Sequence, residues 1–414
     1  MRKNKIYISI ILLLVSLIFF ALLLSRCDAE NNIADESTLM IDNISQGNGN
    51  AGGTGSDKLP DTSLEQTQQQ TTEPPSVSAY GKEYAYDTEK LDLSNTQIEN
   101  PDELIDTLGC FKQLKEVMLY DTGLSMEDKY SLVQAFPDVF FGWTVDLCGV
   151  EVDSVQEQAD ISTHIVEDFA DFSMRLALLP RLGYIDMCDC GLDNGHMEEL
   201  QNTYPGIKFV WKVTLGLWTI RTDCVAFSTL KDGTITYRLT NDDVQVLKYC
   251  TDMVALDLGH NKVTDISFLQ YMPELKILIL VDNWDGETAE HYISDLSMLQ
   301  YVPKLMYLEF FVGDVSDISF LEYTPNLVDL NISYNPIGDV SYLLNLPKIE
   351  RLYLEHTNLT EEDYKLLCDT YPEAKIVYYG EGSVDQGWRE HDRYFAMIDM
   401  FHNNYVHELF SEKQ

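Results

Sequence analysis

A repeat of 22 residues runs through the middle of this chain and sets what it can fold into. Successive copies start at Met253, Leu275, Leu305, Leu327 and Ile349, so the spacing is 22 residues except for one interval of 30. Each copy has apolar residues at its first, fourth and sixth positions. The fourth and sixth positions have the period of two that places both side chains on one face of a short strand. One copy cannot bury this face alone, so successive copies must stack.

The full pattern, Leu-x-x-Leu-x-Leu-x-x-Asn, is the signature of leucine-rich repeats. It predicts an α/β fold, a leucine-rich repeat solenoid with parallel strands on a concave wall and mixed helical and irregular structure on the convex side. Strand residues that alternate with the buried leucines form the concave face of such a solenoid. Because solenoids mostly bind other molecules on this face, the fold favours a binding function.

Two polar positions recur within the repeats. The thirteenth position is aspartate in four copies and the ninth is asparagine in three: Asp265, Asp295, Asp317, Asp339, Asn261, Asn283 and Asn335. Aspartate side chains bind backbone N–H groups in turns, and a buried asparagine amide satisfies backbone groups where a chain leaves a strand. A column of acids could also bind calcium. We favour the structural interpretation for both positions.

The N-terminus predicts membrane attachment. A basic start, residues 1–5, precedes an uncharged run from Ile6 to Ser25, which is about long enough for one membrane-spanning helix. The basic flank should stay in the cytoplasm, so the bulk of the chain should be extracellular. We therefore assign residues 1–27 to a membrane anchor or signal segment, with a single-pass protein of the cell membrane as the expected localisation.

Two alternatives to an uncleaved anchor remain open at this end of the chain. The sequence Leu24-Ser25-Arg26-Cys27 resembles a bacterial lipoprotein box, in which Cys27 would be lipidated, although Arg26 stands where a small residue is usual. Cleavage as an ordinary secretory signal is the other alternative.

Composition divides the rest of the chain. Residues 28–80 are rich in Asn, Gly, Ser, Thr and Gln and predict a disordered linker. Residues 81–225 predict two irregular repeat modules with hairpins, each with a strand, a helix and a second strand that leads into Trp143 or Trp211. These two tryptophans are expected to be core residues. Residues 226–380 form the predicted solenoid, and residues 381–414 predict a helix that caps its last coil.

Charge and motifs exclude several functions. The net charge of −40 argues against nucleic acid as a partner, because binding phosphate requires a basic surface. The sequence contains no nucleophile elbow, phosphate-binding loop or zinc-ligand motif. We therefore expect no enzyme activity, no cofactor, no metal and no small-molecule substrate.

The repeat Leu-x-x-Leu-x-Leu-x-x-Asn-x-Val/Ile-x-Asp-Ile-Ser-x-Leu resembles that of internalin-like surface proteins of Gram-positive bacteria. The resemblance covers roughly residues 85 to 380, with clean repeats only from Met253. It is specific for the fold and weak for function. Internalins usually carry a C-terminal wall-attachment signal, and none is visible after Tyr405. The host-binding role of internalins therefore should not be carried over by default.

An apolar and aromatic cluster on the concave face is the candidate binding site, because exposed clusters of this kind mark interaction sites. The candidate residues are Ile277, Ile279, Tyr307, Glu309, Phe311, Asn331, Tyr334 and Tyr353. The alternative is that the hairpins, the tail or the insertion at residues 284–291 cover the cluster.

The sequence thus predicts a membrane-anchored extracellular protein that binds a protein or a cell-surface polymer on its concave face without catalysis. The alternatives are a structural spacer or assembly subunit at the cell surface and, less favoured, a cell-wall hydrolase that uses catalytic carboxylates.

Overall fold

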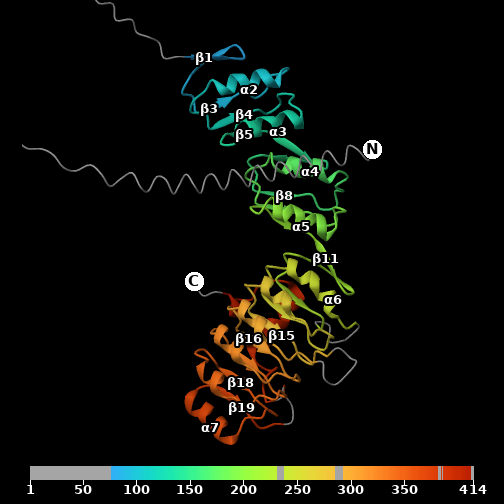
Figure 1. Cartoon of the computed structure of the whole chain (residues 1–414), viewed down its shortest axis with the longest axis vertical. Coiled ribbons are helices and arrows are strands. Elements are labelled where there is room, and N and C mark those ends of the chain that lie inside the picture. The colour runs from blue at the N-terminus through green and yellow to red at the C-terminus, as the bar shows by residue number, and fades with distance from the viewer. Residues whose placement is uncertain (1–75, 231–236, 285–291, 381–383, 385, 412–414) are drawn as a thin grey trace, which may run out of the picture. The chain divides into compact units, whose positions relative to one another are not determined.

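The computed structural model describes residues 76–414 apart from 231–236, 285–291, 381–383, 385 and 412–414 (Figure 1). The described residues belong to one compact unit. The predicted anchor with Cys27, most of the predicted linker and the core of the insertion lie outside them. Within the described ranges, no helix combines the length and the apolarity needed to cross a bilayer.

The first part of the described chain contains a hairpin and two modules, each built on a three-stranded parallel sheet. The hairpin consists of β1 (Ser76–Ala79) and β2 (Lys82–Ala85). The first module contains β3 (Lys90–Asp92), α2 (Pro101–Gly109), β4 (Glu116–Met118), α3 (Met126–Ala135) and β5 (Phe140–Gly142). The second module contains β8 (Gln158–Asp160), α4 (Phe169–Leu176), β9 (Tyr184–Asp186), α5 (Asn194–Thr203) and β10 (Lys208–Val210).

Strand β1 corrects the predicted extent of the linker. It pairs with β2 in antiparallel register, and Ala79 is buried. The polar composition that predicts disorder therefore ends before Ser76, where alternation of small and apolar residues allows a strand.

A hairpin follows each module, in the region where the sequence predicts one. The first is β6 (Thr144–Leu147) with β7 (Val150–Asp153), and the second is β11 (Lys212–Leu215) with β12 (Trp218–Arg221). The first turn has positive φ at both central residues, Cys148 and Gly149, which suits the twist of a two-residue hairpin. Trp143 and Trp211, which precede the hairpins, are both buried, and this confirms them as core residues.

The repeats form a seven-stranded parallel sheet in sequence order. Its strands are β13 (Ala226–Ser228), β14 (Ala255–Asp257), β15 (Ile277–Ile279), β16 (Tyr307–Glu309), β17 (Asp329–Asn331), β18 (Arg351–Tyr353) and β19 (Lys375–Val377). The returning segments are α6 (Asn241–Val244), the 3-10 helices η1 (Gln245–Tyr249), η2 (Ser267–Tyr271), η3 (Ser297–Tyr301), η4 (Ser319–Tyr323) and η5 (Ser341–Asn345), and α7 (Glu361–Thr370). The fourth-position leucines align strand by strand and are fully buried, as the repeat predicts.

Both recurring polar positions have the predicted structural roles. Each aspartate accepts a hydrogen bond from the backbone N–H two residues later, as Asp265 does from Ser267 at 2.9 Å and Asp295 does from Ser297 at 2.7 Å. The three asparagines are buried and bind backbone groups of neighbouring repeats. Asn261, for example, accepts from Leu239 N at 2.7 Å. Side-chain hydrogen bonds thus close the turns between coils.

The C-terminal tail, residues 386–411, contains α8 (Asp392–Asn403) and η6 (Glu408–Phe410). The sequence predicts that this segment caps the last coil. Instead, it runs back across the concave face of the seven-stranded sheet (red in Figure 1). Arg393, near the start of α8, binds Asp329 on β17. Asn404, after its end, accepts from the backbone N–H of Val225 at 2.9 Å, beside β13. The helix takes this course because its apolar side packs on apolar strand residues.

Candidate binding cleft on the concave face

The concave face is open to solvent at the first strand of each module and covered in the seven-stranded sheet. In the modules, the outward strand residues Lys90, Asp92, Gln158 and Asp160 are exposed. In β13 to β18 of the larger sheet, every strand residue is buried. The tail accounts for the difference, because Ala396, Met397, Met400 and Phe401 of α8 belong to one apolar cluster with the outward residues of these strands.

Of the two alternatives for the candidate aromatic cluster, exposed or covered, the structure has the one in which the tail covers it, so these residues do not form an open binding patch. Seven of its eight residues are buried: Ile277, Ile279, Tyr307, Glu309, Phe311, Asn331 and Tyr353. The eighth, Tyr334, is half-buried and stacks on His356 with ring centroids 4.3 Å apart. The fully buried Trp388 fills the space over the cluster, with its ring centroid 5.2 Å from that of Tyr307 and 4.8 Å from that of Tyr353. Part of the cluster is thus a core between the tail and the sheet.

Buried ion pairs fasten the tail to the sheet. Asp329 on β17 is fully buried and accepts from Arg351 Nε at 2.7 Å and from Arg393 Nε at 2.6 Å. Burial alone would raise the pKa of Asp329, but the hydrogen bonds from both guanidinium groups hold this pKa below its usual value. Arg393 also reaches Glu350 at 2.7 Å. Asp329 is therefore charged and paired in the folded chain.

A cleft of about 340 Å³ remains between the tail and the strand ends of β13 to β16. Its tail side is formed by Arg389, Tyr394 and Ile398, and the sheet side carries Ile279 and Val281. Two carboxylates, Asp257 and Glu309, complete the sheet side: they are 6% and 1% exposed. The cleft thus combines apolar walls with two nearly buried acids.

The two acids have different partners. Asp257 accepts from the Ser228 hydroxyl at 2.6 Å and from the Gly259 backbone N–H at 2.9 Å, and burial raises its pKa to about 6. Glu309 accepts from the Tyr307 hydroxyl at 2.7 Å and from Arg389 Nη2 at 3.3 Å. Only Glu309 therefore has a cationic partner in the described part of the chain. Buried negative charge of this kind marks a candidate functional site.

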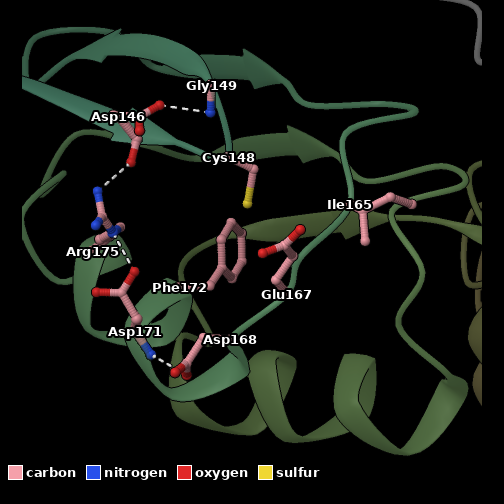
Figure 2. A pocket seen from close by; sticks show the side chains of 9 residues that line it. All are labelled: Asp146, Cys148, Gly149, Ile165, Glu167, Asp168, Asp171, Phe172 and Arg175. Carbon is pink, nitrogen blue, oxygen red and sulfur yellow. Dashed lines mark hydrogen bonds and ion pairs between the residues drawn. The ribbon is translucent and has the colours of Figure 1, made fainter.

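A second hollow, of about 400 Å³, lies between the first hairpin and α4. Figure 2 shows the Cys148 thiol pointing toward the Phe172 ring, with acids around both. Burial, followed by the charge of Asp146, raises the pKa of Cys148, so this thiol is not activated as a nucleophile.

Three of the four acids that line this second hollow have structural partners. Asp168 accepts from backbone N–H groups at the start of α4, and Asp171 binds Arg175 Nε at 2.6 Å (Figure 2). Asp146 accepts from the Gly149 N–H at 2.6 Å across the hairpin turn. Because these bonds explain the three aspartates as a helix cap, a salt bridge and a turn, the cleft under the tail is the stronger candidate.

Sequence reasoning found part of this cleft and missed the rest. Two of the predicted candidate residues, Ile279 and Glu309, line it, whereas Asp257, Arg389 and Tyr394 are not among the predicted candidates. Alternation along β14 does place Asp257 on the concave face. The arginines of the tail were the available signal for its docking, since cations are scarce in a chain with 28 basic and 68 acidic residues.

The repeat, the in-register parallel strands and the coil-closing asparagines define a leucine-rich repeat protein. No protein-family model and no curated protein matches the sequence. Solved structures with similarity to the chain include an internalin from Listeria monocytogenes, at 18% identity over 72% of each chain and a TM-score of 0.31. A leucine-rich repeat protein from Leptospira interrogans is similar at 13% identity over 66% of this chain and 74% of that one, with a TM-score of 0.30.

A third similar structure is the TLR13–ssRNA13 complex, at 14% identity over 72% of this chain and 51% of that chain, with a TM-score of 0.27. At these identities and TM-scores, the fold assignment rests on the repeats and the strand register of the chain itself.

Proposed function

We propose that this chain is a membrane-anchored, extracellular, non-catalytic protein that binds a protein or cell-surface ligand at the cleft between α8 and the concave sheet. The observation that carries the proposal is the cleft itself. Sheet residues Asp257, Ile279 and Glu309 line an unfilled space there, while the tail packs against their neighbours. Because both walls are held by buried contacts, the cleft is formed before a ligand arrives, and this lowers the entropic cost of binding.

The absence of a reactive constellation supports binding over catalysis. Asp257 and Glu309 are each held by hydrogen bonds on the sheet, and among the described lining residues no serine, cysteine or histidine is paired with either acid as an activated nucleophile. Ser228 donates its hydroxyl to Asp257, but burial and the second hydrogen bond from Gly259 make this pair part of a turn.

Site-specific photocrosslinking on intact cells tests the binding function. Tyr394 on the tail side of the cleft would be replaced by p-benzoylphenylalanine, and the exposed Tyr301 at the end of η3 would carry the same group as a matched control. We expect a discrete adduct from position 394 and none from position 301. Adducts of equal yield at both positions, or none at position 394, would favour the structural-spacer alternative.

Fractionation of cells tests the anchor. Deletion of residues 1–26 should move the protein from the membrane fraction to the soluble fraction. Continued sedimentation with membranes would contradict the N-terminal anchor, while leaving the crosslinking result as an independent measure of binding.

A further inference from the structure

The cleft holds more negative than positive charge in its walls. Arg389 offsets Glu309, but the hydrogen-bond donors to Asp257 are the neutral Ser228 hydroxyl and Gly259 N–H. The nearby His260 directs its Nδ1 toward Asp282 at 2.9 Å. A nearly buried carboxylate without a cation is costly, and a cationic ligand group would lower that cost.

The tail already places one cation in this environment. The guanidinium of Arg389 contacts Glu309 and lies over the ring of Tyr394, with its Cζ atom 5.8 Å from the ring centroid. A carboxylate beside an aromatic ring is a combination that recognises guanidinium and ammonium groups. The cleft therefore binds a cation of its own chain on one side and leaves Asp257 for another.

We infer that the cleft binds the side chain of a lysine or arginine carried by a protein partner, with the cationic end at Asp257 and the aliphatic stem along Ile279, Val281 and Ile398. The inference rests on the proposed binding function and names the chemistry of its ligand. About 340 Å³ is at the lower end of ligand sites and suits one long side chain. The net charge of −40 attracts basic partners over long range, which favours a protein source over a free amine.

Proton uptake by Asp257 should compete with this cation. Glu309 on β16, His260 after β14 and Tyr394 on the tail lie near Asp257, and Arg389 lines the same cleft but pairs with Glu309. Because burial raises the pKa of Asp257 to about 6, this carboxylate loses its charge as the pH falls from 7.5 to 5. Affinity for a cation should fall over the same range.

Calorimetric titration of the full chain in mild detergent tests the inference. The probes are the Nα-acetyl amides of lysine, arginine and the neutral isostere norleucine. We expect the lysine and arginine amides to bind at pH 7.5 and norleucine amide not to bind. Asp257→Asn should weaken the binding of both cationic amides about tenfold or more. Asp160→Asn, at the same strand position on an exposed sheet, should leave it unchanged.

Three results would overturn the inference. Equal binding of norleucine amide would show that the stem and not the charge is recognised. Undiminished binding by Asp257→Asn would place the cation elsewhere, provided that circular dichroism shows the variant to be folded. Failure of both cationic amides to bind the wild-type chain at pH 7.5 would show that the cleft has no site for such a side chain. In each case the photocrosslinking result still decides the binding function separately.

Discussion

An aspartate occupies the third strand position both in the modules and in the covered sheet, but its pKa is shifted in opposite directions in the two regions. Asp92 on β3, Asp160 on β8 and Asp257 on β14 each accept from the backbone N–H two residues later, at 3.0, 2.9 and 2.9 Å. Hydrogen bonds with Ser94 and Ser162 lower the pKa of Asp92 and Asp160, whereas burial raises that of Asp257. The repeat thus sets the local geometry, and the tail sets the chemistry.

Two aromatic residues that each occupy the first position of a strand give the largest expected contrast in stability. Tyr307 on β16 is fully buried beneath Trp388, and Phe140 on β5 is half-buried. Tyr307→Ala should lower the free energy of unfolding by about 3–5 kcal/mol, because it leaves a cavity and removes the hydroxyl that donates to Glu309. Phe140→Ala should cost about 1–2 kcal/mol. Urea denaturation measures both, and equal losses would contradict the covering role of the tail.

Arg393, on the tail, and Arg221, in the second hairpin, give a second contrast in stability, of intermediate size. Arg393→Ala removes one of two cations from the fully buried Asp329 and should cost about 2–3 kcal/mol at pH 7.5. Arg221→Ala removes half-exposed pairs with Asp186 on β9 and with Asp223, and it should cost only about 1 kcal/mol, because these charges stay in contact with water.

The pH dependence of this second contrast has a defined sign. The lowered pKa of Asp329 means that its ion pairs stabilise the folded chain above the ordinary pKa of an aspartate and lose this contribution at lower pH. The difference between wild type and Arg393→Ala, followed by urea denaturation, should therefore shrink as the solution is acidified. A difference that is constant down to strongly acidic pH would indicate lost packing and not a lost ion pair.

Asp257 and Asp160, which occupy the same strand position, give the smallest contrast in stability, and here the substitution is expected to stabilise the chain. A raised pKa in the folded chain contributes stability that is present below the unfolded pKa and lost as the pH rises through about 6. At pH 7.5 Asp257 is charged and costly to bury, so Asp257→Asn should stabilise the chain by about 1–3 kcal/mol. The gain should vanish below pH of about 4. Asp160→Asn should bring no gain at either pH, and a gain there would refute burial as the cause.

The sequence predicted the coils well because their signals are local. Leu256 and Leu258 show the period of a strand, Asp265 closes a turn two residues away, and Ser125 caps α3 through the backbone of Asp128. In each case the cause and its effect lie within one repeat or one helical turn. The strand registers of β13 to β19 then follow from stacking identical columns.

The tail and the cleft could not be predicted in the same way. The helical spacing of residues 392–403 indicates an apolar side, but it does not say which surface that side covers. Docking depends on pairs such as Arg393 with Asp329, whose residues lie 64 positions apart. The cleft could not be predicted for a similar reason, because its lining joins Asp257 to Tyr394 and Ile398, which lie far from it in the sequence.

The bond from Asn404 to the backbone of Val225 joins residues 179 positions apart, and it ties the last segment of the chain to the first strand of the large sheet. Stacked coils ordinarily contact only their neighbours and can form one after another as synthesis proceeds. Here the inner surface of six strands stays uncovered until residues 386–411 have been made. This part of the molecule therefore cannot be completed one coil at a time, and a chain cut short before residue 386 would have its strands formed and its apolar interior open to water.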